Sequence, residues 1–375
     1  MNTPNHTPSR LTFALTLGSL LTAMGMAGTA TAGDGEAIGV SAALDGVPYR
    51  IDIPANHNGD LVLLFHGYEP KGIPRDQPWP GVGAAQAFIA AGYAVAASAY
   101  RDQGWVVAEG LRDSQALLAH YIRTHGRPAH VYAAGFSMGG HMALAAAEAQ
   151  PEAFTGVLSL CGVNASAPEV FDAGILASLV ALETLFPGQL PADGLFDPTG
   201  PVMLDAAALE AAFKSDEDTA GLLARQTSIP REGLAGSLGL RYLILRDVAA
   251  RAGGIPVDNW DDHYQGFGDD ADFNARVPRY TGDPKAMRWL SENAVLTGAA
   301  PRPVLLFNNR IDPTVSPPYH LRYQQMAQAQ GRGAQIALWP VEGERHCAFS
   351  PPAIAAAMRH LDDWAERGIH PSVPR

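Results

Sequence analysis

Residues 130–140 have the sequence His-Val-Tyr-Ala-Ala-Gly-Phe-Ser-Met-Gly-Gly. An apolar, strand-like run passes through Gly-x-Ser-x-Gly and continues directly into an alanine-rich helical run that extends to about Gln150. This is the sequence form of a nucleophile elbow, a sharp strand-to-helix turn that exposes a serine hydroxyl at the edge of a sheet. Bulky neighbours would clash in such a turn, so glycine is needed at Gly135 and Gly139. The pattern predicts that Ser137 is a nucleophile, and the alternative is an ordinary glycine-rich turn.

Continuous apolar runs alternate with helical patterns on both sides of this stretch. Such runs are typical of strands that are buried on both faces of a parallel sheet. Residues 36–53 instead alternate between polar and apolar around Asp45-Gly46, which predicts an antiparallel hairpin at the sheet edge. The sequence therefore predicts an α/β fold with a mostly parallel, doubly wound sheet. The predicted strands are 61–65, 93–98, 131–136, 156–161, 303–307 and 336–340, and the predicted helices are 82–91, 105–125, 138–150, 319–330 and 351–367.

The alternation stops between residues 163 and 300. Helical patterns occur there at 175–186, 205–213 and 239–252, separated by loops rich in Pro, Gly and Asp. The block is too long and too structured for a loop. We expect a mainly helical cap, inserted between two adjacent strands and lying over the carboxyl ends of the strands, where ligands bind in such sheets. The core would then comprise residues 33–162 and 301–375.

The first 32 residues predict a Sec-type signal peptide. Arg10 is the only charged residue before Asp34, residues 11–29 are mostly Leu, Ala, Met, Thr and Gly, and Ala30-Thr31-Ala32 forms a small-x-small cleavage pattern. Cleavage after Ala32 would give a secreted or periplasmic protein with no stable membrane anchor, and a retained anchor is the alternative.

Composition excludes several other classes of protein. The 375 residues are 47% hydrophobic and 17% charged with a net charge of −12, which indicates a compact globular protein. No run of five basic residues occurs, so we expect no nucleic-acid partner. Gly81-Val82-Gly83 lacks a third glycine at nucleotide-binding spacing. Asp270-x-Asp272-x-Asn274 has Ala275 where a calcium loop needs glycine. We therefore predict no cofactor and no metal.

A serine nucleophile needs a general base, and the base needs an acid that fixes its tautomer. After an elbow serine the chain order is serine, acid, histidine. Asp312 follows strand 303–307 and His346 follows strand 336–340, so both would reach the same sheet edge as Ser137. Asp312 could instead be a turn or capping residue, and His346 a surface histidine. Glu342 and Asp172 are the other candidate acids.

An oxyanion intermediate needs two backbone N–H donors. Met138, directly after the nucleophile, is one candidate. The other is Tyr68 in the turn His66-Gly67-Tyr68 after strand 61–65, where glycine lets the backbone approach the substrate. The alternative for His66-Gly67 is a plain strand-ending turn. His141, one helical turn after Ser137, is expected to pack along the elbow helix rather than to act as the base.

The chain resembles the α/β-hydrolase superfamily over roughly residues 45–368. This resemblance is carried, in chain order, by His66-Gly67, Gly135-x-Ser137-x-Gly139, Asp312 and His346. Within the superfamily it looks most like secreted bacterial esterases of the feruloyl-esterase and tannase-like kind. The residues that suggest this are the 92–96 run Gly-Tyr-Ala-Val-Ala, the 137–141 run Ser-Met-Gly-Gly-His and the pair His346-Cys347.

The resemblance implies a serine hydrolase that cleaves small-molecule or polymer esters through an acyl-enzyme intermediate. A serine peptidase or amidase on the same fold is the alternative, because the acidic run Asp258–Asp272 could read a free amino terminus. A polyester depolymerase is a further alternative. A non-catalytic binding module on the same scaffold is another, since a fold does not fix a function.

The two cysteines, Cys161 and Cys347, form an isolated pair, which in an exported protein is a disulfide candidate. Two buried free thiols are the alternative. Tannase-like enzymes carry a cysteine directly before the serine, bridged to the cysteine after the histidine. Phe136 stands before Ser137 here, so that bridge is absent and the resemblance leaves Cys161 as a substitute partner for Cys347.

Overall fold

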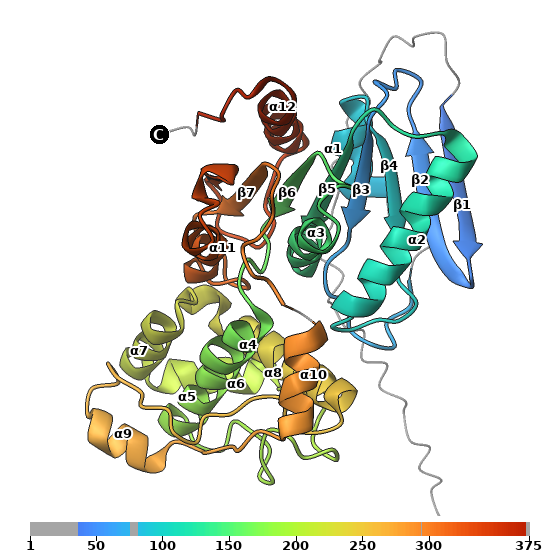
Figure 1. Cartoon of the computed structure of the whole chain (residues 1–375). Helices are drawn as coiled ribbons and strands as arrows, with labels where there is room; N and C mark the ends of the chain where they lie inside the picture. The colour runs from blue at the N-terminus through green and yellow to red at the C-terminus, as the bar shows by residue number, and fades with distance from the viewer. Residues whose placement is uncertain (1–36, 76–81, 294, 373–375) are drawn as a thin grey trace, which may run out of the picture.

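The computed structural model of the protein describes residues 37–75, 82–293 and 295–372. Within them a single sheet of eight strands has the order β1-β2-β4-β3-β5-β6-β7-β8 (Figure 1). All pairs from β4 through β3 to β8 are parallel, whereas β2 is antiparallel to both β1 and β4. The predicted mostly parallel sheet is therefore confirmed. The strands are β1 (Ile38–Leu44), β2 (Val47–Ile53), β3 (Leu61–Phe65), β4 (Ala94–Ser98), β5 (Val131–Phe136), β6 (Gly156–Leu160), β7 (Val304–Asn309) and β8 (Ile336–Val341).

Helices cover both faces of the sheet, which is why its central strands are mainly apolar. Alternate side chains of a strand point to opposite faces. Leu61 and Leu63 of β3 accordingly pack in the core under α2 (Val107–His125) and α3 (Met138–Ala149). Val62 and Leu64 pack in the core under α1 (Val82–Ala90) and α12 (Pro351–Arg367) on the other face. The helix α11 (Pro318–Ala329) and a short 3-10 turn, η3 (Gly333–Gln335), connect β7 to β8.

The edge hairpin has the predicted turn. Leu44 of β1 pairs with Val47 of β2, so Asp45 and Gly46 form a two-residue loop. Their φ angles are 50° and 80°, the left-handed region that such hairpin turns require at both positions.

The segment 163–300, which we call the cap segment, joins the adjacent parallel strands β6 and β7 and lies beyond one end of the sheet (Figure 1). Its described residues contain helices and loops but no strand, as expected of a helical cap. The predicted helices 175–186, 205–213 and 239–252 correspond to α5, α6 and α8, whereas α7, α9 and α10 were not predicted. The elements are α4 (Ala167–Glu169), the π-helix η1 (Val170–Leu176), α5 (Ala177–Leu185), α6 (Ala206–Ser215), α7 (Glu217–Thr227), η2 (Arg231–Gly233), α8 (Leu234–Ala252), α9 (Asp270–Arg276) and α10 (Pro284–Asn293).

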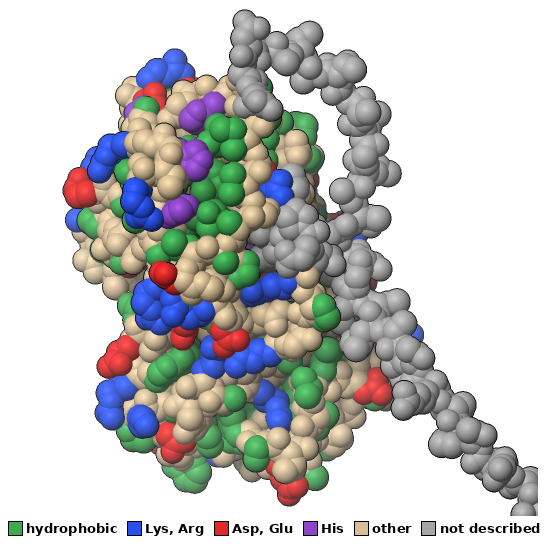
Figure 2. Space-filling model, turned by 90° about the vertical axis from the view of Figure 1, so that its right-hand side faces the viewer, with side chains coloured by type: hydrophobic (Ala, Val, Ile, Leu, Met, Phe, Trp, Pro, Cys, Tyr) green, Lys and Arg blue, Asp and Glu red, His purple; other side chains and the backbone are tan. Residues whose placement is uncertain are grey.

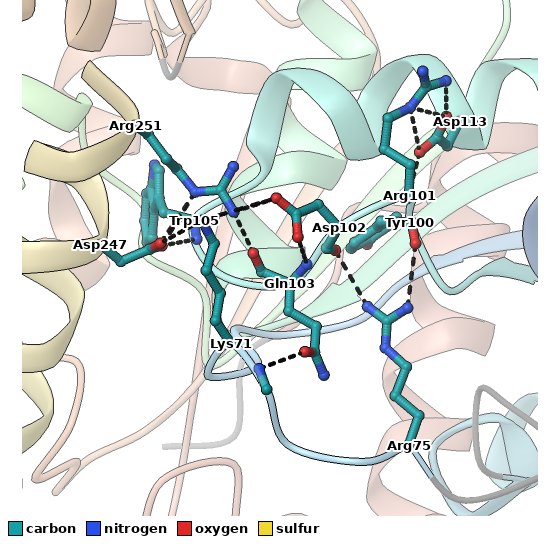
Figure 3. Close-up of polar contacts among 11 residues, drawn as sticks. Lys71, Arg75, Tyr100, Arg101, Asp102, Gln103, Trp105, Asp113, Asp247 and Arg251 are labelled. Carbon is teal, nitrogen blue, oxygen red and sulfur yellow. Dashed lines mark hydrogen bonds and ion pairs between the residues drawn. The ribbon is translucent and has the colours of Figure 1, made fainter. Parts of the chain in front are cut away.

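The helix α8 of the cap segment is fixed to the core by the loop between β4 and α2 (Figure 3). The Asp247 carboxylate accepts a hydrogen bond of 2.6 Å from the Trp105 backbone N–H. Arg251 pairs with the same carboxylate at 3.2 Å and with Asp102 at 3.0 Å. The side chains of Arg251 and Asp247 are only 9% and 6% exposed, so their pairing is little screened by solvent. Charged side chains of both signs are intermixed at this level of the surface, where the core meets the cap segment (Figure 2).

Among the described residues, no helix has the length and the apolar character needed to span a bilayer. The predicted signal peptide, residues 1–32, lies outside the described residues.

Candidate active site

Ser137 stands between the last residue of β5 and the first residue of α3, in a conformation that few non-glycine residues adopt. Its φ and ψ angles are 58° and −121°. The turn is held by a 2.9 Å hydrogen bond from the Ser137 N–H to the Leu160 carbonyl of β6. A β-carbon on Gly135 would overlap the backbone of Gly139, and one on Gly139 would overlap the Phe65 carbonyl. The structure thus has the elbow geometry, with glycine where side chains cannot fit.

Asp312 and His346 are brought together from the loops after β7 and β8. The Nδ1 atom of His346 lies 2.8 Å from Oδ2 of Asp312, whose side chain is fully buried. The other carboxylate oxygen accepts hydrogen bonds of 2.8 and 2.9 Å from the N–H groups of Thr314 and Val315. Because a carboxylate only accepts, Nδ1 of His346 carries the proton and Nε2 is left as the basic nitrogen.

Nε2 of His346 is buried and makes no hydrogen bond to any described residue. No hydrogen bond joins it to Ser137 Oγ among the described contacts. Such contacts are often long in a site without substrate and tighten when substrate binds. Among the described residues, His346 is therefore oriented by Asp312 but does not contact Ser137 through a hydrogen bond.

Cys161 and Cys347 form a disulfide with a Cα–Cα distance of 5.2 Å, so the alternative of two free thiols is wrong. Cys161 directly follows β6, the strand next to the elbow strand, and Cys347 directly follows His346. Both sulfurs and a ring nitrogen of His346 lie within 4.8 Å of one another. The bond ties the histidine loop to the sheet edge beside Ser137. Because the sulfurs are bonded to each other, neither can act as a thiolate ligand for a metal.

The turn 66–68 lies directly against the elbow. A β-carbon on Gly67 would lie 3.4 Å from Cβ of Ser137 and 3.3 Å from the Phe136 carbonyl oxygen, so a larger residue would crowd the serine. The imidazole of His66 stacks on Tyr100 with a centroid distance of 3.9 Å, and its Nδ1 donates to the Gly67 carbonyl at 2.8 Å. Burial lowers the pKa of His66 to about 4, so this ring is neutral near pH 7.

Met138 begins α3, so its N–H lies outside the hydrogen-bond ladder of that helix and at the positive end of the helix dipole. Met138 and Tyr68 both line the same cavity as Ser137. The two residues expected to donate to an oxyanion therefore line one cavity with Ser137, although they lie on opposite sides of the serine in the sequence.

That cavity lies between the core and the cap segment and has a volume of about 70 Å³. Its walls are mainly apolar side chains, including Trp105 from the core and Ile175, Leu240 and Ile244 from the cap segment. Arg241 is the single charged side chain among the described residues that line it. Arg241 is not among the residues that the sequence singles out, although an arginine directly between Leu240 and Tyr242 in a helical run is a signal that could have drawn attention to it.

The other candidate residues have different surroundings. Glu342 is exposed and pairs with Arg310 at 2.7 Å. Asp172 accepts a hydrogen bond from the Asp258 N–H at 3.2 Å, and burial raises its pKa to about 6. Neither acid contacts His346 among the described contacts. His141 is fully buried on α3, with Nδ1 3.0 Å from the Val163 carbonyl, which agrees with the packing role expected for it.

The acidic run 258–272 holds loop and helix ends within the cap segment. Asp258 and Asp269 accept backbone hydrogen bonds from Gly282 and Asp272. Asp270 accepts hydrogen bonds from two further N–H groups, those of Gly266 and Phe267. None of the run lines the cavity at Ser137.

The strand order, the elbow between β5 and α3, and the acid and histidine loops after β7 and β8 together define the α/β-hydrolase fold. A family model described as "Putative esterase" matches residues 102–232, about a third of the chain, including the elbow. This match supports a hydrolase that acts on ester substrates. No curated protein matches the chain.

Several solved structures are similar over most of the chain at low identity. Est1E from Butyrivibrio proteoclasticus, solved with ferulic acid bound, is 14% identical with a TM-score of 0.45, and the match covers 86% of this chain and 97% of that one. An esterase/lipase from an uncultured bacterium is 12% identical with a TM-score of 0.46, covering 89% and 87%. The acylaminoacyl peptidase of Pyrococcus horikoshii is 12% identical with a TM-score of 0.43, covering 88% and 41%. Sequence identities and TM-scores this low do not distinguish one hydrolase reaction from another.

Proposed function

We propose that the protein is a secreted serine hydrolase that cleaves carboxylic esters. Ser137 Oγ attacks the ester carbonyl while Nε2 of His346 takes the hydroxyl proton. The tetrahedral oxyanion is held by the N–H groups of Met138 and Tyr68. Collapse expels the alcohol, which receives the proton from His346, and leaves an acyl-serine. Water, deprotonated by His346, then releases the carboxylic acid and restores Ser137. Asp312 keeps Nδ1 protonated and stabilises the imidazolium.

One observation carries this proposal. A serine in a strained elbow opens into an apolar cavity, while a buried aspartate orients a histidine whose second nitrogen has no other partner among the described residues. A strained position is maintained at a cost and is concentrated at functional sites. The disulfide beside the histidine is typical of proteins in oxidising compartments, which favours export of this protein.

The cavity favours a small ester over a polymer. Its volume of about 70 Å³ is well below the roughly 300–1,000 Å³ of sites for drug-sized ligands. A short acyl or alcohol group fits this space, and a polymer segment would need the cap segment to move.

A peptidase or amidase is the second candidate, because the same triad serves both reactions. A site that reads a free amino terminus needs an acidic side chain near the nucleophile. The described residues around this cavity include no acid and one arginine, which disfavours a cationic substrate.

The test is hydrolysis of short p-nitrophenyl esters compared with aminoacyl p-nitroanilides, by the mature protein and by Ser137→Ala. We expect ester cleavage that falls by about 10⁴-fold or more in the variant, because the acyl-enzyme route is lost. Cleavage of only the anilides would favour the peptidase. Equal ester cleavage by the variant and the parent protein would contradict the assignment of Ser137.

A further inference from the structure

Arg241 is a buried cation in the wall of the cavity that contains Ser137. It lies on α8, its residue is only 6% exposed, and it lines the cavity together with Ser137 and Met138. A guanidinium removed from water is costly unless it is paired with an anion and its donors are satisfied. The partners of Arg241 therefore indicate whether its role is structural or lies in binding a ligand.

The described residues give Arg241 only neutral partners. One Nη atom donates to Ser316 Oγ at 2.7 Å, and the other reaches the Gly174 carbonyl at 3.5 Å. No carboxylate of the described residues lies within ion-pair distance of it. A guanidinium has five N–H donors, so most of its donor capacity is not used by these contacts.

Arg251, nearly three turns further along α8, provides the comparison. Its side chain is similarly enclosed at 9% exposed, but it pairs with the two carboxylates of Asp247 and Asp102. On the same helix, Arg251 thus has a counter-ion in Asp247, whereas Arg241, which lines the cavity, has none among the described residues.

The surroundings of Arg241 also provide room and a second polar group. The hydroxyl of Tyr319 lies against Gly174, where a β-carbon would overlap it, so glycine is required for Tyr319 to reach the cavity wall. Gly174 lies in the π-helix η1, an irregularity that occurs often at functional sites. The remaining walls are mainly apolar, so they strengthen an electrostatic contact within the cavity.

We infer that Arg241 binds a carboxylate of the substrate, so that the enzyme prefers esters that carry a second, anionic group close to the scissile bond. Arginine suits this role because its planar fork matches both oxygens of a carboxylate. This inference rests on the proposed function. The carboxylate can belong to the acid part or to the alcohol part of the ester, and the cavity volume of about 70 Å³ limits that part to a few atoms.

The test compares each anionic ester with a neutral substrate of the same shape. Monoethyl succinate against ethyl 4-oxopentanoate places the charge on the acid part. O-Acetylglycolate against acetoxyacetone places it on the alcohol part. The value of kcat/KM is measured by titration of the acid released, after subtraction of the spontaneous rate. We expect a preference of about 10-fold or more for the anionic member of one pair, from a charge-assisted hydrogen bond.

The matched variants are Arg241→Met, Arg241→Lys and Arg246→Met. Arg241→Met is expected to lower the anionic-to-neutral ratio about 10- to 100-fold, and Arg241→Lys to keep part of it. Arg246, on the same helix, donates at 2.7 Å to the Asp197 carbonyl and does not line the cavity, so its replacement should leave the ratio unchanged. Equal rates within both pairs, or an equal loss for anionic and neutral esters in Arg241→Met, would overturn the inference and make Arg241 a structural bridge.

A binding measurement separates this inference from the proposed chemistry and does not depend on the folding of an Arg241 variant. Thermal unfolding of Ser137→Ala is followed with succinate and with succinamide. We expect succinate to raise the melting temperature and the uncharged diamide to leave it unchanged. No shift with succinate overturns the carboxylate site. If Ser137→Ala instead keeps full esterase activity while succinate still stabilises it, the assignment of Ser137 as nucleophile is wrong and the carboxylate site is supported.

Discussion

The core and the cap segment contribute different kinds of groups to the candidate active site. The core supplies a strained serine, a histidine and a buried aspartate, all fixed by strand ends, backbone hydrogen bonds and a disulfide. The cap segment supplies apolar walls and one arginine without a counter-ion among the described residues. The difference suggests that the core determines how fast any ester reacts and that the cap segment determines which ester is chosen. Changes in the core should therefore alter all substrates alike, whereas changes in the cap segment should alter ratios between substrates.

Asp312→Asn should have the largest effect of the changes considered below. Its carboxylate accepts from His346 Nδ1 and from two backbone N–H groups, and an amide placed there would favour the wrong tautomer of the histidine. We expect kcat to fall about 10³- to 10⁴-fold for every ester with little change in KM.

The matched control is Glu342→Gln, which removes an exposed acid near the same sheet edge whose partner is Arg310. It should leave the rates unchanged. A large loss in Glu342→Gln together with a small loss in Asp312→Asn would reassign the acid.

Cys161→Ser should destabilise the core by about 2–5 kcal/mol in the free energy of unfolding, because it removes a cross-link between residues 186 positions apart. Urea unfolding with and without reductant measures this. The variant should be insensitive to reductant and the parent protein sensitive. Since the bond holds the histidine loop, kcat should also fall, and an unchanged unfolding midpoint in reductant would show that the bond contributes nothing.

The buried ring of His66 should make stability depend on pH. Its pKa is lowered by burial from 6.5 to about 4, so the unfolded chain binds the proton more readily. The neutral ring therefore contributes to the free energy of unfolding in full above about pH 6.5. This contribution, about 3 kcal/mol, is lost as the pH falls towards 4. The difference in unfolding free energy between pH 7 and 4.5 should be smaller in His66→Gln. An identical pH dependence in the variant would show that another group is responsible.

Asp247→Asn tests the junction between the two regions and should have the smallest of these effects. The carboxylate joins Trp105 of the core to Arg251 of the cap segment. Losing its charge should cost about 1–3 kcal/mol of stability. Because α8 also carries Arg241 into the cavity, KM for the preferred ester should rise more than kcat falls. Asp363→Asn, in an exposed helix pair with Arg367, should change stability by no more than about 0.5 kcal/mol and leave KM unchanged.

The core could be predicted from sequence because its signals are local. A strand that is buried on both faces is apolar at most positions, so 61–65 matches β3 at both ends and 156–161 matches β6 within one residue. Asp312 and His346 could be placed at one sheet edge because the carboxyl ends of parallel strands share an edge. The choice of residue then followed from the chain order of such sites.

The helices of the cap segment were harder to predict from the sequence, because they depend on contacts between residues distant in the chain. Helix α9 is only seven residues long, and α7 is a polar helix that begins at an Asp216 cap, so neither has a strong apolar period. Helix α8 begins at Leu234, five residues before the predicted start, because a glycine and a serine in its first turns weaken the helical pattern. The cavity itself could not be predicted, since it combines η1, α8 and the loop after Asp312.

Covalent trapping shows whether Ser137 is the nucleophile of an esterase. The mature protein is treated with a fluorophosphonate, and the modified residue is located by peptide mass spectrometry while residual esterase activity is measured. We expect one adduct per chain, on Ser137, with activity lost in proportion to labelling and no adduct on Ser137→Ala. An adduct on another residue that abolishes activity, or full labelling of Ser137 with undiminished ester cleavage, would contradict it.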